Sequence, residues 1–226
     1  MPRDHDAGHE PPDQPEQAVP EPRPAAVTFV TTEHFTLQGA RSSTVAEATG
    51  RASIFLGTVS GGLVALGLIG TAAGVGAAFY AFGLILLSTL AFVGIVTFDR
   101  VLQSGIEDVG YAARIARLRG YYFRYAPELV GYLLSVPPAQ RLRMQGLRGG
   151  RWQGFLTVAG MVAVVTAVLA GSAAGLLAAV VARSGHSLVA ALVAGAVVAG
   201  AVLVGLMRYQ RSAWERVSMA RLFDDE

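Results

Sequence analysis

Residues 52–98 read ASIFLGTVSGGLVALGLIGTAAGVGAAFYAFGLILLSTLAFVGIVTF, 47 consecutive positions without Asp, Glu, Lys, Arg or His. A membrane-spanning helix needs about 20 apolar residues, because each residue adds about 1.5 Å across a hydrocarbon core about 30 Å thick. The run is therefore too long for one crossing and long enough for two. The small residues at 70–76 (GTAAGVG) supply a turn, which predicts spans over about 52–71 and 76–98.

A second uncharged stretch lies farther along the chain. Residues 154–182 again contain none of these five residue types, and another apolar run follows the short segment 183–186. The same length argument predicts spans over about 155–181 and 187–207. The sequence thus predicts an all-α integral membrane protein, with four transmembrane helices in two hairpins and a cytoplasmic helical segment between them.

The polar segments complete the predicted organisation. The N-terminal tail is acidic, rich in proline and too poor in apolar residues to fold. A juxtamembrane helix follows, with Thr32 as its N-cap and a Glu47–Arg51 pair at i,i+4 spacing. This helix either continues the first span or lies on the interface, and the sequence leaves both open. The predicted segments are the tail 1–24, juxtamembrane helix 25–51, first hairpin 52–98, cytoplasmic segment with basic linker 99–153, second hairpin 154–207 and C-terminal tail 208–226.

The cytoplasmic segment begins as a helical continuation of the second span. Apolar side chains recur every three or four residues along it, at Leu102, Ile106, Val109, Ala113 and Ala116. Charged and polar residues take the opposite side, at Arg100, Gln103, Glu107, Arg114 and Arg117. This spacing predicts an amphipathic helix that Gly120 and Pro127 then interrupt.

Arginine is distributed unevenly across the predicted membrane. Residues 1–51, 99–153 and 208–226 carry 4, 9 and 4 Arg, whereas the turn 183–186 carries one and the turn 70–76 none. Basic residues near span ends favour the cytoplasmic side. We therefore expect a multi-pass protein of the plasma (inner) membrane with both termini in the cytoplasm, and Trp152, Tyr209 and Trp214 as interfacial anchors.

Several function classes are excluded or disfavoured by missing residues. The chain has no Cys and no Lys, which excludes thiolate metal sites, iron–sulfur clusters and lysine Schiff bases. The predicted spans contain no acid, Arg or His, which disfavours proton-coupled transport. We expect a protein that is not an enzyme, with no catalytic, cofactor-binding or metal-binding residue.

Small residues four positions apart recur in the spans. Such spacing lets helix backbones approach closely, either within one chain or between copies. We interpret them as packing positions within one bundle, with a homo-oligomer interface as the alternative. The glycine positions are Gly57 and Gly61, Gly171 and Gly175, and also Gly195 and Gly200, which lie four residues after Ala191 and Ala196.

Hydroxyl side chains are the other polar feature of the spans. Thr58, Ser60 and Thr166 belong to this set, together with Ser88, Thr97, Thr157 and Ser172. They could line a pore, but hydroxyls in helices commonly donate to a backbone carbonyl of their own helix. We therefore expect bonding within the helix.

Four arginines lie just before the third span, at Arg141, Arg143, Arg148 and Arg151. Each juxtamembrane basic residue gains about 1 kcal/mol from an anionic leaflet. We expect this linker to contact a bilayer with anionic headgroups, the alternative being that it only sets topology. Arg–aromatic mixtures can also bind nucleic acid, but beside a membrane no nucleic-acid partner is expected.

One family resemblance rests on residues 32–120. A polar helix ending in EATGRAS (47–53) enters a glycine-bearing span, turns, and leaves through a second span into a charged helix. This pattern resembles the membrane hairpin of effectors in bacterial cyclic-nucleotide anti-phage defence systems, although those effectors commonly have Lys where Arg51 stands. The resemblance implies a hairpin that impairs the membrane on activation. The residues themselves favour a non-enzymatic scaffold or regulator acting through its cytoplasmic segments, with an oligomeric pore or membrane-disrupting effector as the alternative.

Overall fold

The computed structural model describes residues 24–125, 157–182 and 187–223. Within these residues the chain forms four helices and no strand: α1 (Pro24–Ala73), α2 (Ala77–Tyr125), α4 (Val158–Val181) and α5 (Ser187–Phe223). All four helices are long and apolar enough to cross a membrane. The all-helical fold expected from the sequence is thereby confirmed. Membrane insertion and the pairing into two membrane hairpins stay predictions.

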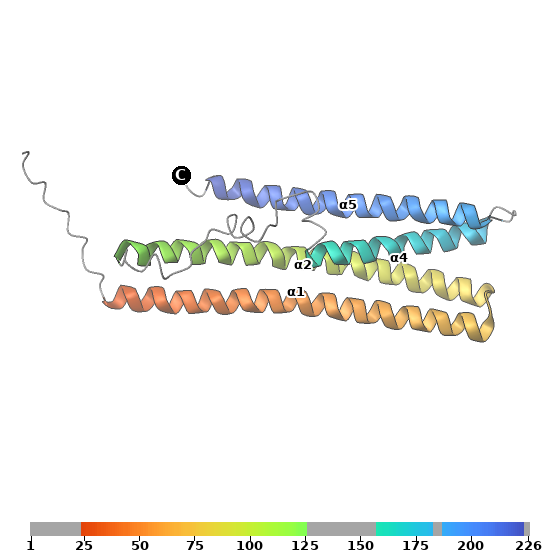
Figure 1. Ribbon diagram of the computed structural model, residues 1–226, viewed down its shortest axis with the longest axis horizontal. Coiled ribbons are helices and arrows are strands. Elements are labelled where there is room, and N and C mark those ends of the chain that lie inside the picture. The colour runs from red at the N-terminus through yellow and green to blue at the C-terminus, as the bar shows by residue number, and fades with distance from the viewer. Residues whose placement is uncertain (1–23, 126–156, 183–186, 224–226) are drawn as a thin grey trace, which may run out of the picture.

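The helices lie side by side in the order α1, α2, α4, α5 (Figure 1). α2 packs against both α1 and α4, whereas α5 packs chiefly against α4. In the described part of the chain, α1 and α5 do not contact each other. Among the four described helices the array therefore stays open instead of closing into a bundle, and each edge helix keeps a face that none of the other three covers.

α1 and α2 form one long antiparallel hairpin. α1 ends at Ala73 because Gly74 takes a left-handed conformation (φ +69°), which glycine adopts without steric cost. The two helices run antiparallel: Gly70 lies beside Phe79 near the turn, and Thr31 lies beside Tyr122 at the far end. The hairpin thus pairs over almost its whole length.

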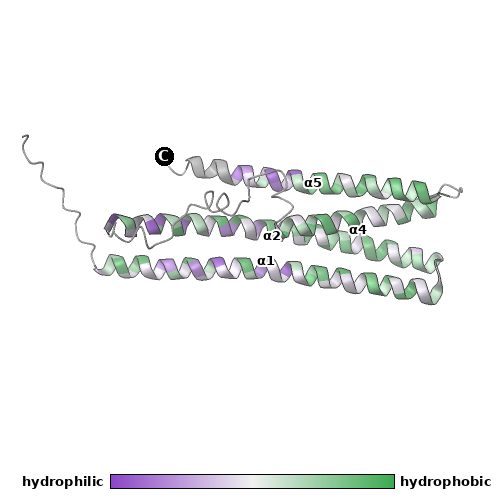
Figure 2. Cartoon of the chain, in the orientation of Figure 1, coloured by the Kyte–Doolittle hydropathy of each residue, from purple (hydrophilic) through white to green (hydrophobic). Residues whose placement is uncertain are grey.

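The juxtamembrane residues belong to this hairpin. α1 is one continuous helix, so the described structure has a straight continuation of the first apolar segment, not a separate helix. The N-terminal part of α1 and the C-terminal part of α2 continue past the N-terminal end of α4. Hydrophilic residues are concentrated in these two parts (Figure 2). We call these parts, residues 24–51 and 99–125, the stalk. At 1.5 Å per residue each stalk helix is about 40 Å long.

The tightest core lies where α1, α2 and α4 meet. Phe55, Phe98, Val162 and Thr166 are at most 2% exposed there. Gly94 makes this crossing possible, because an added Cβ would overlap the Thr166 hydroxyl and lie 2.9 Å from the Phe55 ring. The missing side chain lets three helices approach at one level.

α4 and α5 are held together differently. A Cβ added at Gly171 would lie 2.5 Å from the Gly195 carbonyl oxygen and 2.7 Å from the Ala199 Cβ. A Cβ at Gly175 would lie 2.9 Å from the Ala191 carbonyl oxygen. The two backbones are thus in direct contact, which only glycine permits.

Three local predictions are corrected by the structure. Thr32 is not an N-cap, because α1 already begins at Pro24, a residue tolerated in the first turn, and the Thr32 carbonyl accepts a hydrogen bond from Thr36. Gly120 does not interrupt α2, which continues to Tyr125. A helical glycine costs only about 1 kcal/mol relative to alanine, and pairing with α1 can offset that.

The third correction concerns the apolar stripe of α2. Leu102 is buried and Ile106 and Val109 are half-buried, as predicted, but Ala113 and Ala116 are exposed and Ile115 is buried instead. Burying the larger apolar side chain of Ile115 removes more apolar surface from water than burying either alanine would. The predicted polar side is confirmed, since its residues are exposed: Arg100, Gln103, Glu107, Arg114 and Arg117.

Candidate functional site

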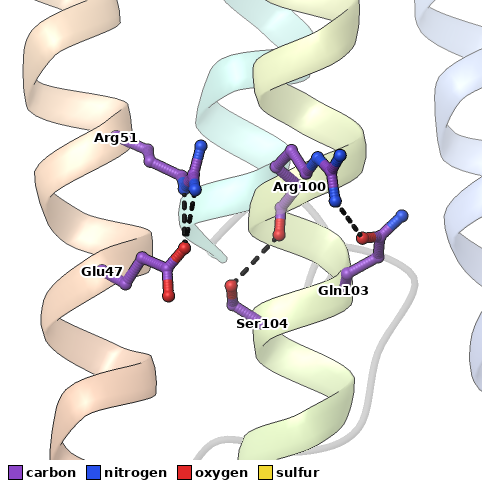
Figure 3. A network of polar contacts seen from close by, with 5 residues as sticks. All are labelled: Glu47, Arg51, Arg100, Gln103 and Ser104. Atoms are coloured by element: carbon purple, nitrogen blue, oxygen red, sulfur yellow. Dashed lines mark hydrogen bonds and ion pairs between the residues drawn. The ribbon is translucent and has the colours of Figure 1, made fainter.

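Polar contacts gather at the level where the apolar segments end. On α1, the guanidinium of Arg51 donates to Glu47 Oε1 at 2.7 and 2.9 Å, which confirms the predicted i,i+4 pair. On α2, Arg100 Nη1 donates to Gln103 Oε1 at 3.3 Å and Ser104 Oγ donates to the Arg100 carbonyl at 3.2 Å. Figure 3 shows the two sets side by side on neighbouring helices. At this level the uncharged residues 52–98 meet the charged residues on either side of them, and we call it the boundary.

Asp99 connects two helices at this boundary. Its Oδ2 accepts from Gln103 Nε2 at 2.8 Å on the same helix, and its Oδ1 accepts from the Tyr209 hydroxyl of α5 at 3.0 Å. The Tyr209 ring also lies against Phe98, with ring centroids 6.4 Å apart. Tyr209, predicted as a membrane-interface anchor, is therefore also a link between α2 and α5, which the sequence analysis missed.

A groove lies between α2 and α5 around this link. It has a volume of about 570 Å³. Its lining comprises Ile95, Val96, Phe98, Asp99, Arg100, Gln103, Leu206 and Tyr209. We call it the boundary groove. Apolar side chains from the ends of two spans line one part, and a carboxylate, a guanidinium, an amide and a phenol line the other.

A smaller cavity of about 190 Å³ has lining residues from all four helices. Its wall includes Thr44 and Ala48 of α1, Ser104 of α2 and Trp214 of α5.

Thr157 is the N-cap of α4, where its side chain accepts a hydrogen bond from the Gly160 amide at 3.0 Å. An N-cap of this kind contributes about 1 kcal/mol to stability, so we assign Thr157 a structural role at the start of α4.

An ion pair joins the two helices of the stalk. Arg41 Nε lies 2.7 Å from Asp108 Oδ1, and Arg41 Nη2 lies 3.3 Å from Asp108 Oδ2. The hydrogen bond to Asp108 raises the pKa of Arg41 above its ordinary value; burial lowers this pKa by less, and the negative charge of Asp108 adds a still smaller increase. Leu37 and Ile115 are buried nearby along the same helices. This bidentate pair fixes the register of the stalk.

The hydroxyl prediction is confirmed at three positions. Thr58, Ser60 and Thr166 donate to the carbonyls of Ile54, Leu56 and Val162, at 2.9, 2.9 and 2.7 Å. Each acceptor lies four residues earlier in the same helix, which is the usual partner of a helical hydroxyl. These bonds occupy the hydroxyl protons within the helix.

The six glycines predicted for helix packing fall into two groups. Gly171, Gly175 and Gly195 lie in the contact between α4 and α5. Gly57, Gly61 and Gly200 lie where an added Cβ would meet nothing within 4 Å. The second group lies on the edge helices, on faces that the other described helices leave open.

The four arginines predicted to contact lipid headgroups, Arg141, Arg143, Arg148 and Arg151, lie outside the described residues. Among the residues that are described, no cluster of three or more His, Asp or Glu side chains could hold a metal ion. What the boundary offers chemically is a carboxylate and a guanidinium on adjacent residues, at the rim of an apolar groove.

Comparison with protein-family models, with curated proteins and with solved structures found no match to this chain.

Proposed function

We propose that the protein is a multi-pass membrane protein of the plasma (inner) membrane that acts, without catalysis, as a scaffold or regulator through its stalk. Four apolar helices support insertion. The arginine-rich segments support a cytoplasmic location for both termini and for the segment between the second and third spans.

The observation that carries this proposal is the continuity of the stalk with the apolar hairpin. α1 and α2 pass from uncharged to charged sequence without a break. In the stalk they stay paired through Arg41–Asp108 and through the contact of Thr31 with Tyr122 at 3.4 Å. A rigid rod about 40 Å long on two membrane spans is suited to hold a partner at a distance from the bilayer.

The stalk also presents aromatic surface to such a partner. Phe29 and Phe35 of α1 are 74% and 70% exposed. Exposed aromatic side chains are enriched at protein interfaces. A photoreactive amino acid at position 35 should therefore cross-link a specific protein in cells, and the same group at Val75, at the opposite end of the hairpin, serves as the control. Cross-links only between copies of this chain would contradict a scaffold.

Topology can be tested directly because the native chain has no Cys. In intact cells, an impermeant maleimide should label Val75→Cys, in the turn between α1 and α2. It should label Gln38→Cys, an exposed stalk position, only after permeabilisation. Labelling of both from the same face would refute the proposed orientation.

An oligomeric pore or membrane-disrupting effector is the second candidate function. The open helix array favours it, because Gly57 and Gly61 on α1 and Gly200 on α5 face no other helix among the described residues. Purified protein in dye-loaded liposomes distinguishes the two candidates. We expect no ion flux for a scaffold, whereas flux that rises steeply with protein concentration would favour the pore.

A further inference from the structure

We propose that the boundary groove is a binding site for one zwitterionic phospholipid with a primary ammonium headgroup, phosphatidylethanolamine. This inference rests on the proposed membrane location, because only insertion would place the groove at the headgroup level.

The groove has the two-part chemistry of such a lipid. Ile95, Val96 and Leu206 belong to the last apolar turns of α2 and α5, and they line the part that an acyl chain would occupy. Asp99 and Arg100 are the first charged residues after the long uncharged run, and they line the rim. An amphipathic occupant would satisfy both parts at once.

The rim groups retain hydrogen-bonding capacity for a headgroup. Asp99 accepts one bond at each carboxylate oxygen, whereas a carboxylate offers about four acceptor positions. Arg100 donates Nη1 to Gln103, whereas a guanidinium carries five N–H donors. An ammonium donating to Asp99 and a phosphate accepting from Arg100 would use this capacity.

The paired charges select among phospholipids. In phosphatidylethanolamine the phosphate and the ammonium match Arg100 and Asp99, respectively. Phosphatidylglycerol has no cation for Asp99, and its phosphate would lie near a carboxylate. Phosphatidylcholine has a cation without N–H donors, so it would lose the charge-assisted hydrogen bond. We therefore expect the order ethanolamine, then choline, then glycerol.

Native mass spectrometry of the full-length, delipidated protein tests this order. Phosphatidylethanolamine, phosphatidylcholine and phosphatidylglycerol are added separately, and the fraction of protein with one bound lipid is measured. Asp99→Asn should weaken phosphatidylethanolamine binding about tenfold, as expected for loss of a charged hydrogen bond, and should leave phosphatidylglycerol binding equal or stronger. Glu107→Gln, an exposed charge change on the same helix outside the groove, should change neither.

Arg100→Gln gives an independent check, because Arg100 is exposed and its loss should not affect folding. It should weaken binding of all three lipids. Equal binding of phosphatidylethanolamine and phosphatidylglycerol by the native chain, or an unchanged preference in Asp99→Asn, would overturn the lipid site while leaving the proposed function intact. Extraction of the protein from membranes by alkaline carbonate would instead refute membrane insertion, and both proposals with it.

Discussion

The α1–α2 hairpin and the α4–α5 pair solve the same packing problem in different ways. α1 and α2 are joined by side chains: buried Phe55 and Phe98 in the apolar part and the Arg41–Asp108 pair in the stalk. α4 and α5 approach through bare backbone at Gly171, Gly175 and Gly195. The first contact can adapt by moving side chains, whereas the second cannot at these glycines, where backbone meets backbone.

We relate this difference to the proposed membrane location, which would place the stalk in water and the α4–α5 pair among lipid tails. A stalk in water can use charge and apolar burial. Helices surrounded by lipid tails gain little from apolar burial and depend on close approach and van der Waals contact. The two pairs should therefore respond oppositely to steric and electrostatic substitutions.

The largest effect should come from Gly171→Ala. Its new Cβ would meet backbone and the Cβ of Ala199, so the helices must separate, at a cost of about 2–3 kcal/mol. Reversible unfolding in mixed detergent micelles would measure this. Gly200→Ala is the matched control on α5, where the Cβ meets nothing, and it should be neutral or stabilising by up to about 1 kcal/mol. Equal effects would show that α4 and α5 do not pack this closely.

A smaller effect should follow from Asp108→Asn in the stalk. Its carboxylate and the Arg41 guanidinium are both partly exposed, and solvent screening weakens such pairs, so we expect a loss of about 1 kcal/mol or less. The double variant with Arg41→Gln should cost little more than either single variant, because the two residues interact with each other. Full additivity in this cycle would argue against the pair, and a loss that persists unchanged in 1 M salt would argue against its electrostatic origin.

The smallest effect should come from Glu47→Gln. Its partner Arg51 lies on the same helix and both side chains are about half-exposed, so the pair contributes about 0.3–0.5 kcal/mol. Comparison with Asp108→Asn separates a contact within one helix from a contact between two helices. A larger loss from Glu47→Gln than from Asp108→Asn would mean that the stalk helices do not depend on each other.

Much of the local structure was predictable from sequence. Residues 52–98 predicted two long apolar helices with a turn at 70–76, and the observed turn is at Gly74. The Glu47–Arg51 pair was predictable because both residues lie on adjacent turns of one helix. The start of α1 was not, because Thr32 has the residue type of an N-cap but lies inside a longer helix.

The candidate site was predictable only in part. Tyr209 could be predicted as an interfacial residue because it is a tyrosine at the end of an apolar run. Its hydrogen bond to Asp99 could not, because the two residues are 110 positions apart. Gly94 resembles every other glycine in the spans, yet it is the one opposite Phe55 and Thr166. No periodicity within one helix specifies such a partner.

The long apolar helices with charged extensions could be predicted from residue order, because hydropathy and helix propensity act over short stretches of chain. Three features became visible only in the folded chain: α2 lies between α1 and α4, the array of described helices is open, and the boundary groove forms between α2 and α5. These features depend on which surfaces fit each other. A glycine becomes a packing position only when another backbone lies against it. A carboxylate links two helices only when a donor from elsewhere in the chain lies within hydrogen-bonding distance.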